Sequence, residues 1–260
     1  TQANRHMGGL DVFTDSIHVN LNNPASYGFS KVTTYSVGIN YTNNNLSSSN
    51  ESQNSDVASI DYISVSIPAG KFSFGFGLLP LTSVGYRVQG TNETSENQTF
   101  NRYEGNGGLN QAYLSVGLPI TSYFAIGSTI NYNFGNLFYR TGQFLEGIDN
   151  GTFMSNESSV SGLSFQFSGQ FKIPIQKKHT LQGMYSYQPK IGLDSRNSRI
   201  FSTQSLSTEI LTDIVRIDLA SSGLENTNLD LSSMTRIGLG YGKNKKWFFG
   251  VQYNLIKSSN

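Results

Sequence analysis

The stretch Phe124-Ala-Ile-Gly-Ser-Thr-Ile-Asn-Tyr-Asn-Phe-Gly135 decides the fold, because bulky apolar residues occupy nearly every second position in it. Ala, Gly, Thr and Asn fill the positions between them. Side chains of a β-strand alternate between the two faces of the sheet, so this pattern predicts a strand with one apolar and one polar face. Residues 163–173 repeat the design, with Leu, Phe and Ile opposite Ser, Gln and Lys.

The same alternation recurs along the chain and predicts about nine strands. They cover residues 33–41, 57–67, 72–88, 112–118, 124–135, 163–173, 181–188, 236–241 and 247–255. Most are close to the length of about 9–11 residues that a tilted membrane strand needs. Only residues 206–231 have a spacing that suits a short amphipathic helix.

The connections between these strands alternate strictly between short and long. The short ones are residues 68–71, 119–122, 174–179 and 243–246, and the long polar ones are residues 42–56, 89–110, 141–159 and 189–235. Such sorting is typical of an outer-membrane barrel, which has short periplasmic turns and long extracellular loops. A soluble Greek-key sandwich is the alternative, but its solvent face would carry more Lys, Arg and Glu. The predicted fold class is an all-β, antiparallel, up-and-down transmembrane β-barrel.

The composition excludes several other classes of protein. Of the 260 residues, 12% are aromatic, which is too many for a disordered chain, and the absence of Cys excludes a disulfide scaffold. No run of 18 apolar residues exists, so a helical membrane protein is excluded. A net charge of +1 provides no basic surface for DNA or RNA, and no nucleic-acid partner is predicted.

The sequence contains no recognisable catalytic constellation. It has three His, no Cys and no Gly-x-Ser-x-Gly motif, so we predict no catalytic residues and no enzymatic activity. His6, Asp11, Asp15 and His18 do not follow the spacing of a metal-ligand motif. We therefore predict neither a metal nor a cofactor.

Three stretches resemble FadL-like outer-membrane barrels, in the branch that includes barrels associated with type 9 secretion. They are Asn22-Asn-Pro-Ala-Ser26, residues 67–86 and residues 238–253. The resemblance implies an outer-membrane location and an N-terminal hatch of residues 1–30 folded inside a barrel of residues 31–260. It also implies that Asn23, Pro24 and Ala25 form the hatch motif.

Pro80 lies inside the third predicted strand. Because proline cannot donate to the strand ladder, it predicts a kink or bulge there. Alternatively, the strand ends at this point and an irregular loop follows. In FadL-like barrels a kink in the third strand opens a window toward the lipid, so the resemblance implies that Pro80 and Gly85 mark a lateral opening.

About nine strands are fewer than a FadL-like barrel contains, and lipid does not tolerate an unpaired strand edge. We therefore expect this chain to be part of a longer protein, cut at both ends. The alternative is a sheet that strands of another chain complete.

Two functions are compatible with these observations. The first is an accessory or plug-type subunit of an outer-membrane protein-translocation machine, similar to type 9 secretion, with outer-membrane lipid, a larger translocon barrel and other subunits as partners. The alternative is a conduit for a small hydrophobic molecule through the hatch and the lateral opening. A conduit needs an apolar pocket, whereas the predicted inward faces are mostly Asn, Gln, Ser and Gly, which favours the first function.

Overall fold

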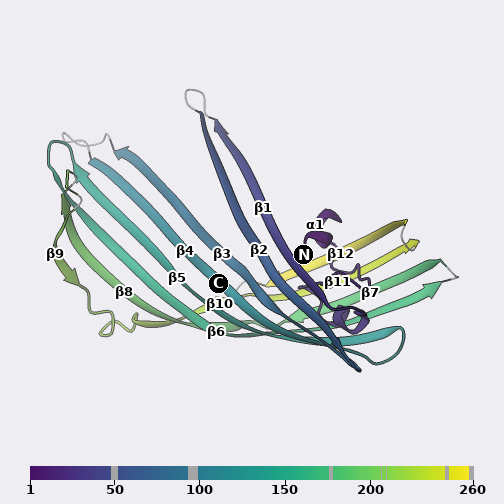
Figure 1. Cartoon of the computed structure of the whole chain (residues 1–260). Coiled ribbons are helices and arrows are strands. Elements are labelled where there is room, and N and C mark those ends of the chain that lie inside the picture. Colours follow the sequence, from purple (N-terminus) through teal and green to yellow (C-terminus); the bar gives the residue numbers. More distant parts are fainter. Residues whose placement is uncertain are drawn as a thin grey trace.

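The strands of the computed structural model form one twelve-stranded antiparallel sheet (Figure 1). The structure describes residues 1–47, 52–92, 99–175, 178–205, 207–208, 210–243 and 246–257. Two short helices, α1 (Gln2–His6) and η1 (Pro24–Phe29), precede the sheet. No helix in the described part of the chain is long and apolar enough to cross a membrane.

Nine of the strands follow one another side by side across the sheet. In this order they are β1 (Thr34–Ser47), β2 (Ser52–Ala69), β3 (Phe72–Asn92), β4 (Thr99–Pro119), β5 (Phe124–Leu145), β6 (Asn150–Ile175), β7 (His179–Gln188), β11 (Ser233–Lys243) and β12 (Trp247–Lys257). Each predicted strand falls on one of these nine. The all-β, antiparallel part of the predicted fold class is therefore confirmed.

The prediction of long polar loops is wrong for most of their described residues, because the strands continue through them. The β3–β4 ladder reaches the pair Asn92–Thr99, and the β5–β6 ladder reaches the pair Gln143–Thr152. Residues 48–51 and 93–98 lie outside the described residues. Backbone hydrogen bonds need no apolar side chain, so a polar segment can extend a ladder that an apolar segment begins.

The longest predicted loop, residues 189–235, contains β8 (Ile191–Ser205), β9 (Leu211–Arg216) and β10 (Asn226–Leu231). The helix suggested within residues 206–231 is therefore wrong. β6 pairs with β7 along its second half and with β8 along its first half. β7 and β8 therefore lie end to end along the same side of β6. β10 in turn pairs with β8, as β11 does with β7.

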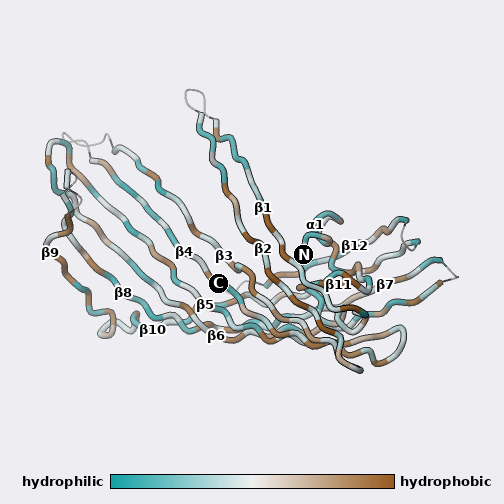
Figure 2. Tube along the Cα trace, viewed as in Figure 1, coloured by the Kyte–Doolittle hydropathy of each residue, from teal (hydrophilic) through white to brown (hydrophobic). Residues whose placement is uncertain are grey.

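The two faces of the sheet have the polarity of a protein in lipid. On β5, Asn131 and Asn133 are buried, while Tyr132 between them is 48% exposed. Apolar and polar residues alternate in this way along the strands (Figure 2). A sheet in water would bury its apolar face, so the reversed polarity fits an apolar surface surrounded by lipid.

The sheet does not close into a barrel. Among the described residues β1 and β12 are the two ends of the row of nine strands, and no pairing joins them. β2 pairs with β3 only from Ala69 to Ile63, and beyond that point the β1–β2 hairpin diverges from β3 (Figure 1). The sheet forms an open, curved trough, and the prediction of a barrel is wrong in this respect.

Candidate functional site

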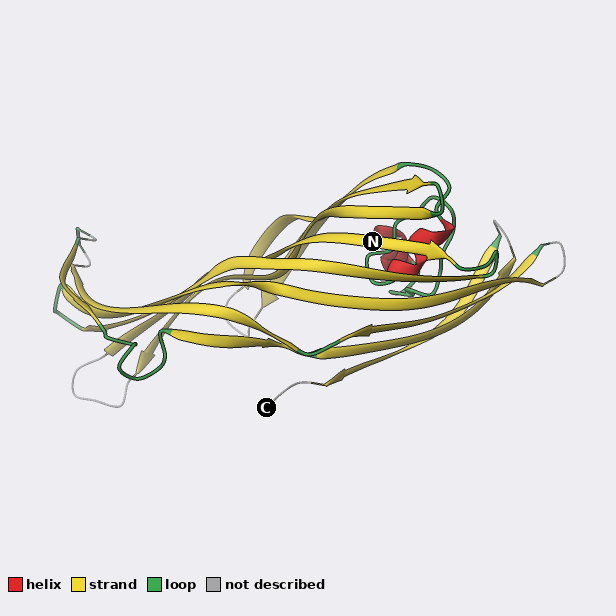
Figure 3. Cartoon of the chain, turned by 90° about the horizontal axis from the view of Figure 1, so that it is seen from below, coloured by secondary structure: helices red, strands yellow, loops and turns green. Residues whose placement is uncertain are grey.

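The N-terminal segment, residues 1–33, lies in the hollow of the sheet near the end that carries the short turns (Figure 3). Its helix η1 contacts β3, β4, β5 and β6. Pro24, Ala25, Ser26 and Tyr27 of this helix are all buried. Where η1 lies, the polar face of β3 to β6 is therefore covered by the chain's own N-terminal segment.

Glycines on the polar face let the N-terminal segment approach the strands closely. A Cβ atom added at Gly127 would lie 2.3 Å from the carbonyl carbon of Pro24. One added at Gly75 would lie 2.1 Å from the ring of Tyr27. Since real Cβ contacts are longer than 3.0 Å, only glycine fits at these two positions with the segment in place.

Gln170 of β6 is fully buried and joins three parts of the N-terminal segment. Its Oε1 accepts hydrogen bonds from Thr14 Oγ1 at 2.9 Å and from Asn23 Nδ2 at 2.6 Å. Its Nε2 donates to the carbonyl of Val12 at 3.0 Å. Buried polar groups are costly without partners, so this side chain fixes the position of the segment.

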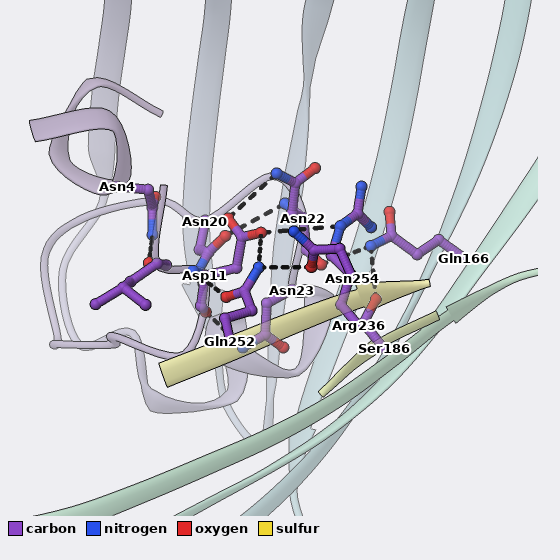
Figure 4. Close-up of polar contacts among 11 residues, drawn as sticks. Asn4, Asp11, Asn20, Asn22, Asn23, Gln166, Ser186, Arg236, Gln252 and Asn254 are labelled. Atoms are coloured by element: carbon purple, nitrogen blue, oxygen red, sulfur yellow. Dashed lines mark hydrogen bonds and ion pairs between the residues drawn. The ribbon is translucent and has the colours of Figure 1, made fainter. Parts of the chain in front are cut away.

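Two further side chains of β6 repeat this mode of contact. Gln166 Nε2 donates to the carbonyl of Asn22 at 2.6 Å and to Ser186 Oγ at 2.9 Å (Figure 4). Ser168 Oγ accepts a hydrogen bond of 2.7 Å from the backbone N–H of Ala25. Alternate residues of a single strand thus bind the segment from Val12 to Ala25.

Asp11 connects the N-terminal segment to the last two strands. Its carboxylate lies 3.8 Å from Arg236 Nε of β11, and both side chains are largely buried. Gln252 of β12 accepts a hydrogen bond of 2.7 Å from the Asp11 backbone N–H and donates one of 3.1 Å to its carboxylate (Figure 4). The segment therefore spans the trough from β3 to β12.

Replacing Gln170 by Ala should destabilise the protein by about 2–3 kcal/mol, since it leaves buried partners such as Asn23 and Thr14 without this acceptor. The free energy of unfolding in detergent measures the change. Gln143→Ala removes the same side chain from an exposed position on β5 and serves as the control. Equal stability of the two variants would contradict the assigned role of Gln170.

Tyr27 anchors the inner end of η1. Its hydroxyl donates to that of Tyr113 at 3.4 Å, and Tyr113 in turn shares a hydrogen bond of 2.5 Å with Ser64. Burial raises the pKa of Tyr27 well above its ordinary value, so the phenol stays neutral and available for hydrogen bonding.

In the part of the chain that the structure describes, no three His, Asp or Glu side chains gather as a metal site would require.

The residues of the predicted hatch motif lie together at the start of η1. Asn23 and Ala25 have no exposed surface, and Pro24 occupies the first turn of the helix. Sequence reasoning missed their partners Gln166 and Gln170. The available signal was glutamine repeated on the polar face of one strand, because such a face needs hydrogen-bonding partners when it is covered.

Pro80 lies in β3, where the register against β4 shifts between Pro80 and Thr82. The pairing of β3 with β2 ends two residues earlier, at Leu78. Gly85 continues β3 beyond the shift and pairs with Asn106. The role of Pro80 and Gly85 as a lateral opening stays a prediction.

A trough with an apolar outer face, and with its own N-terminal segment bound to its polar inner face, defines an outer-membrane β-sheet protein. The model of the BamG family matches residues 1–260, and the chain belongs to this family. BamG proteins are structural accessory subunits of the outer-membrane β-barrel assembly machinery, the BAM complex. The protein is accordingly located at the bacterial outer membrane, as predicted. No curated protein matches the chain.

The family match overturns the resemblance to FadL-like barrels and to barrels of type 9 secretion. The motifs that suggested it have a simpler physical origin. Gly75 and Gly127 leave room for the N-terminal segment, and Asn23 to Ala25 fill that room. Any outer-membrane sheet with a bound segment can meet the same packing requirement.

Proposed function

We propose that this accessory subunit is a membrane-embedded scaffold whose open sheet edge pairs with a strand of a neighbouring barrel subunit of the BAM complex. The function is structural, and no chemical step is assigned to the chain. The family match supports an association with BAM subunits, and the BamA barrel is the partner that we propose.

The observation that carries the proposal is the exposure of β1 and β12, the edge strands at the two ends of the row of nine. Val251 and Phe249 on β12 are 79% and 74% exposed, and Tyr35 on β1 is 77% exposed. Ile130 and Phe167, on strands flanked at both sides, are 47% and 50% exposed. The edge strands thus carry apolar side chains that lack a lateral neighbour.

The backbone of an edge strand strengthens this argument. In lipid no water satisfies the N–H and C=O groups of the free edge, and each such group costs several kcal/mol. Another strand is the partner that satisfies a whole row of them at once. At membrane depth, such a strand comes from another membrane-spanning β-sheet.

The N-terminal segment has a supporting part in this proposal. We assign residues 1–30 as a plug that fills the trough, and residues 31–260 as the membrane sheet with its hairpin extensions. The plug joins β6 to β12 through Gln170 and Asp11. Rigid strands present their edges in a fixed geometry, so the plug prepares the edge for pairing.

Site-specific photo-crosslinking in cells tests the proposal. A photoreactive residue at Val37 on β1 should crosslink to another BAM subunit, and the BamA barrel is the expected product. The control position is Leu114 on β4, which has nearly the same exposure, 55% against 59%, but lies inside the sheet. A crosslink from Leu114 with equal yield, or none from Val37, would contradict edge pairing.

A further inference from the structure

A cavity of about 780 Å³ lies between the N-terminal segment and the short-turn ends of β6, β7, β11 and β12. Its volume is within the range of about 300–1,000 Å³ that is typical of small-molecule sites. Four of the lining residues are lysines from three separate parts of the chain, namely Lys31, Lys172, and the pair Lys243 and Lys246 where β11 leads into β12. Lys172 of β6 holds the N-terminal segment by donating to the carbonyl of Thr14 at 2.9 Å, but this contact does not account for the other three lysines.

Asp15 is the acidic residue of the lining, and it already has partners. Its carboxylate accepts hydrogen bonds from the backbone N–H groups of Ile17 and His18 at 2.9 and 2.7 Å. Burial acts to raise the pKa of Asp15, but these bonds outweigh it, so the pKa lies below its ordinary value and the group is charged. Four lysines against this one carboxylate leave the cavity with a net positive charge, which suits an anionic ligand.

The rest of the lining is largely apolar and aromatic. Phe13 of the N-terminal segment packs edge-to-face on Phe248 of β12, with ring centroids 5.1 Å apart. Trp247 belongs to the lining and also contacts the rings of Tyr241 and Phe249 at tilted angles, with ring centroids 5.7 and 5.4 Å away. Trp and Tyr gather where an outer-membrane sheet crosses the interface between lipid and water. The cavity therefore lies at the depth of lipid headgroups.

We propose that this cavity binds the headgroup of an anionic phospholipid, with the lysines around the phosphate and the acyl chains against the aromatic rim. A phosphate is the anionic group that lipid presents at this depth, and lysine is a common phosphate-binding residue. The bound lipid would join the N-terminal segment to the β6–β7 and β11–β12 ends. This inference does not depend on edge pairing with another subunit.

Native mass spectrometry of the full-length protein in detergent tests the lipid site. The variant Lys31→Gln/Lys243→Gln removes two of the lining charges and leaves Lys172, which bonds to the carbonyl of Thr14, in place. We expect phosphatidylglycerol binding to fall about 30-fold, because each of the two lysines contributes on the order of 1 kcal/mol near a lipid surface and about 1.4 kcal/mol corresponds to a factor of ten. The control Lys71→Gln/Lys257→Gln removes the same charge from exposed sites and should bind as the parent does.

Three results would overturn the proposal. They are equal phosphatidylglycerol binding by the two double variants, binding of phosphatidylethanolamine as tight as that of phosphatidylglycerol, and binding of glycerol 3-phosphate as tight as that of the intact lipid. The last would identify a site for small anions rather than for lipid. Binding to the parent protein should also weaken as salt rises, which tests the charge contribution without any substitution.

Discussion

Gly127→Val is expected to release the N-terminal segment from the sheet and to lower stability by about 3 kcal/mol. A Cβ at this position would lie 2.3 Å from the carbonyl carbon of Pro24 and 2.4 Å from the backbone nitrogen of Ala25. Because both neighbours are backbone atoms, no side-chain rotation relieves the clash. Limited proteolysis should cut within residues 1–33 of the variant at protease concentrations that leave the parent intact.

Gly169→Val is the matched control for this change. Gly169 lies on β6, and an added Cβ there meets only the ring of Phe124, at 3.6 Å or more. This is an ordinary van der Waals distance, so proteolysis and the thermal unfolding temperature should stay close to those of the parent. If Gly127→Val also matched the parent in both measurements, the N-terminal segment would not be packed as described.

Ile130→Arg is expected to block insertion into the outer membrane, at a cost of about 2–4 kcal/mol. Ile130 lies on the outer face of β5, about 20 Å along the strand from Phe124 at about 3.3 Å per residue. A strand tilt of about 45° then places it near the middle of an apolar band about 25 Å tall. The measurement is the fraction of protein in the outer membrane that shows heat-modifiable gel migration.

Val88→Arg provides a depth control for this prediction. Val88 is similarly exposed, at 55% against 47%, but it lies near the far end of β3, in the hairpin extension. An arginine beyond the lipid band costs about 0–1 kcal/mol, so this variant should insert almost normally. If both arginine variants lost membrane insertion equally, Ile130 and Val88 would not lie at different depths in the membrane.

The sequence predicted the strands and their faces well, because both follow from the local alternation of residues. Asn131 and Asn133 alternate with Ile130 and Tyr132, and this pattern alone separates the buried face from the exposed one. The ends of the strands could not be predicted in this way. Thr99 and Asn92 pair through backbone groups that every residue carries, so their polar side chains leave no signal of the ladder.

The sequence indicated the residues of the N-terminal segment that take part in these contacts, but not the strand residues that they contact. The segment from Asn23 to Ala25 is distinctive in sequence, and it does lie buried in the trough. Its partner Gln170 is 147 residues away, and one sequence contains no information on such long-range pairing. The same holds for the trough itself, since the register at Ile63 and Leu78, where β2 leaves β3, depends on the whole sheet.

The most direct test of this account is a cryo-electron microscopy structure of the assembled BAM complex in a lipid nanodisc, with this subunit in its full-length form. We predict a strand of the neighbouring barrel hydrogen-bonded along β1, with the N-terminal segment still in the trough. A β1 edge that faces lipid, or that pairs with a strand of its own chain, would contradict the proposal that this subunit joins the machine through its open sheet edge.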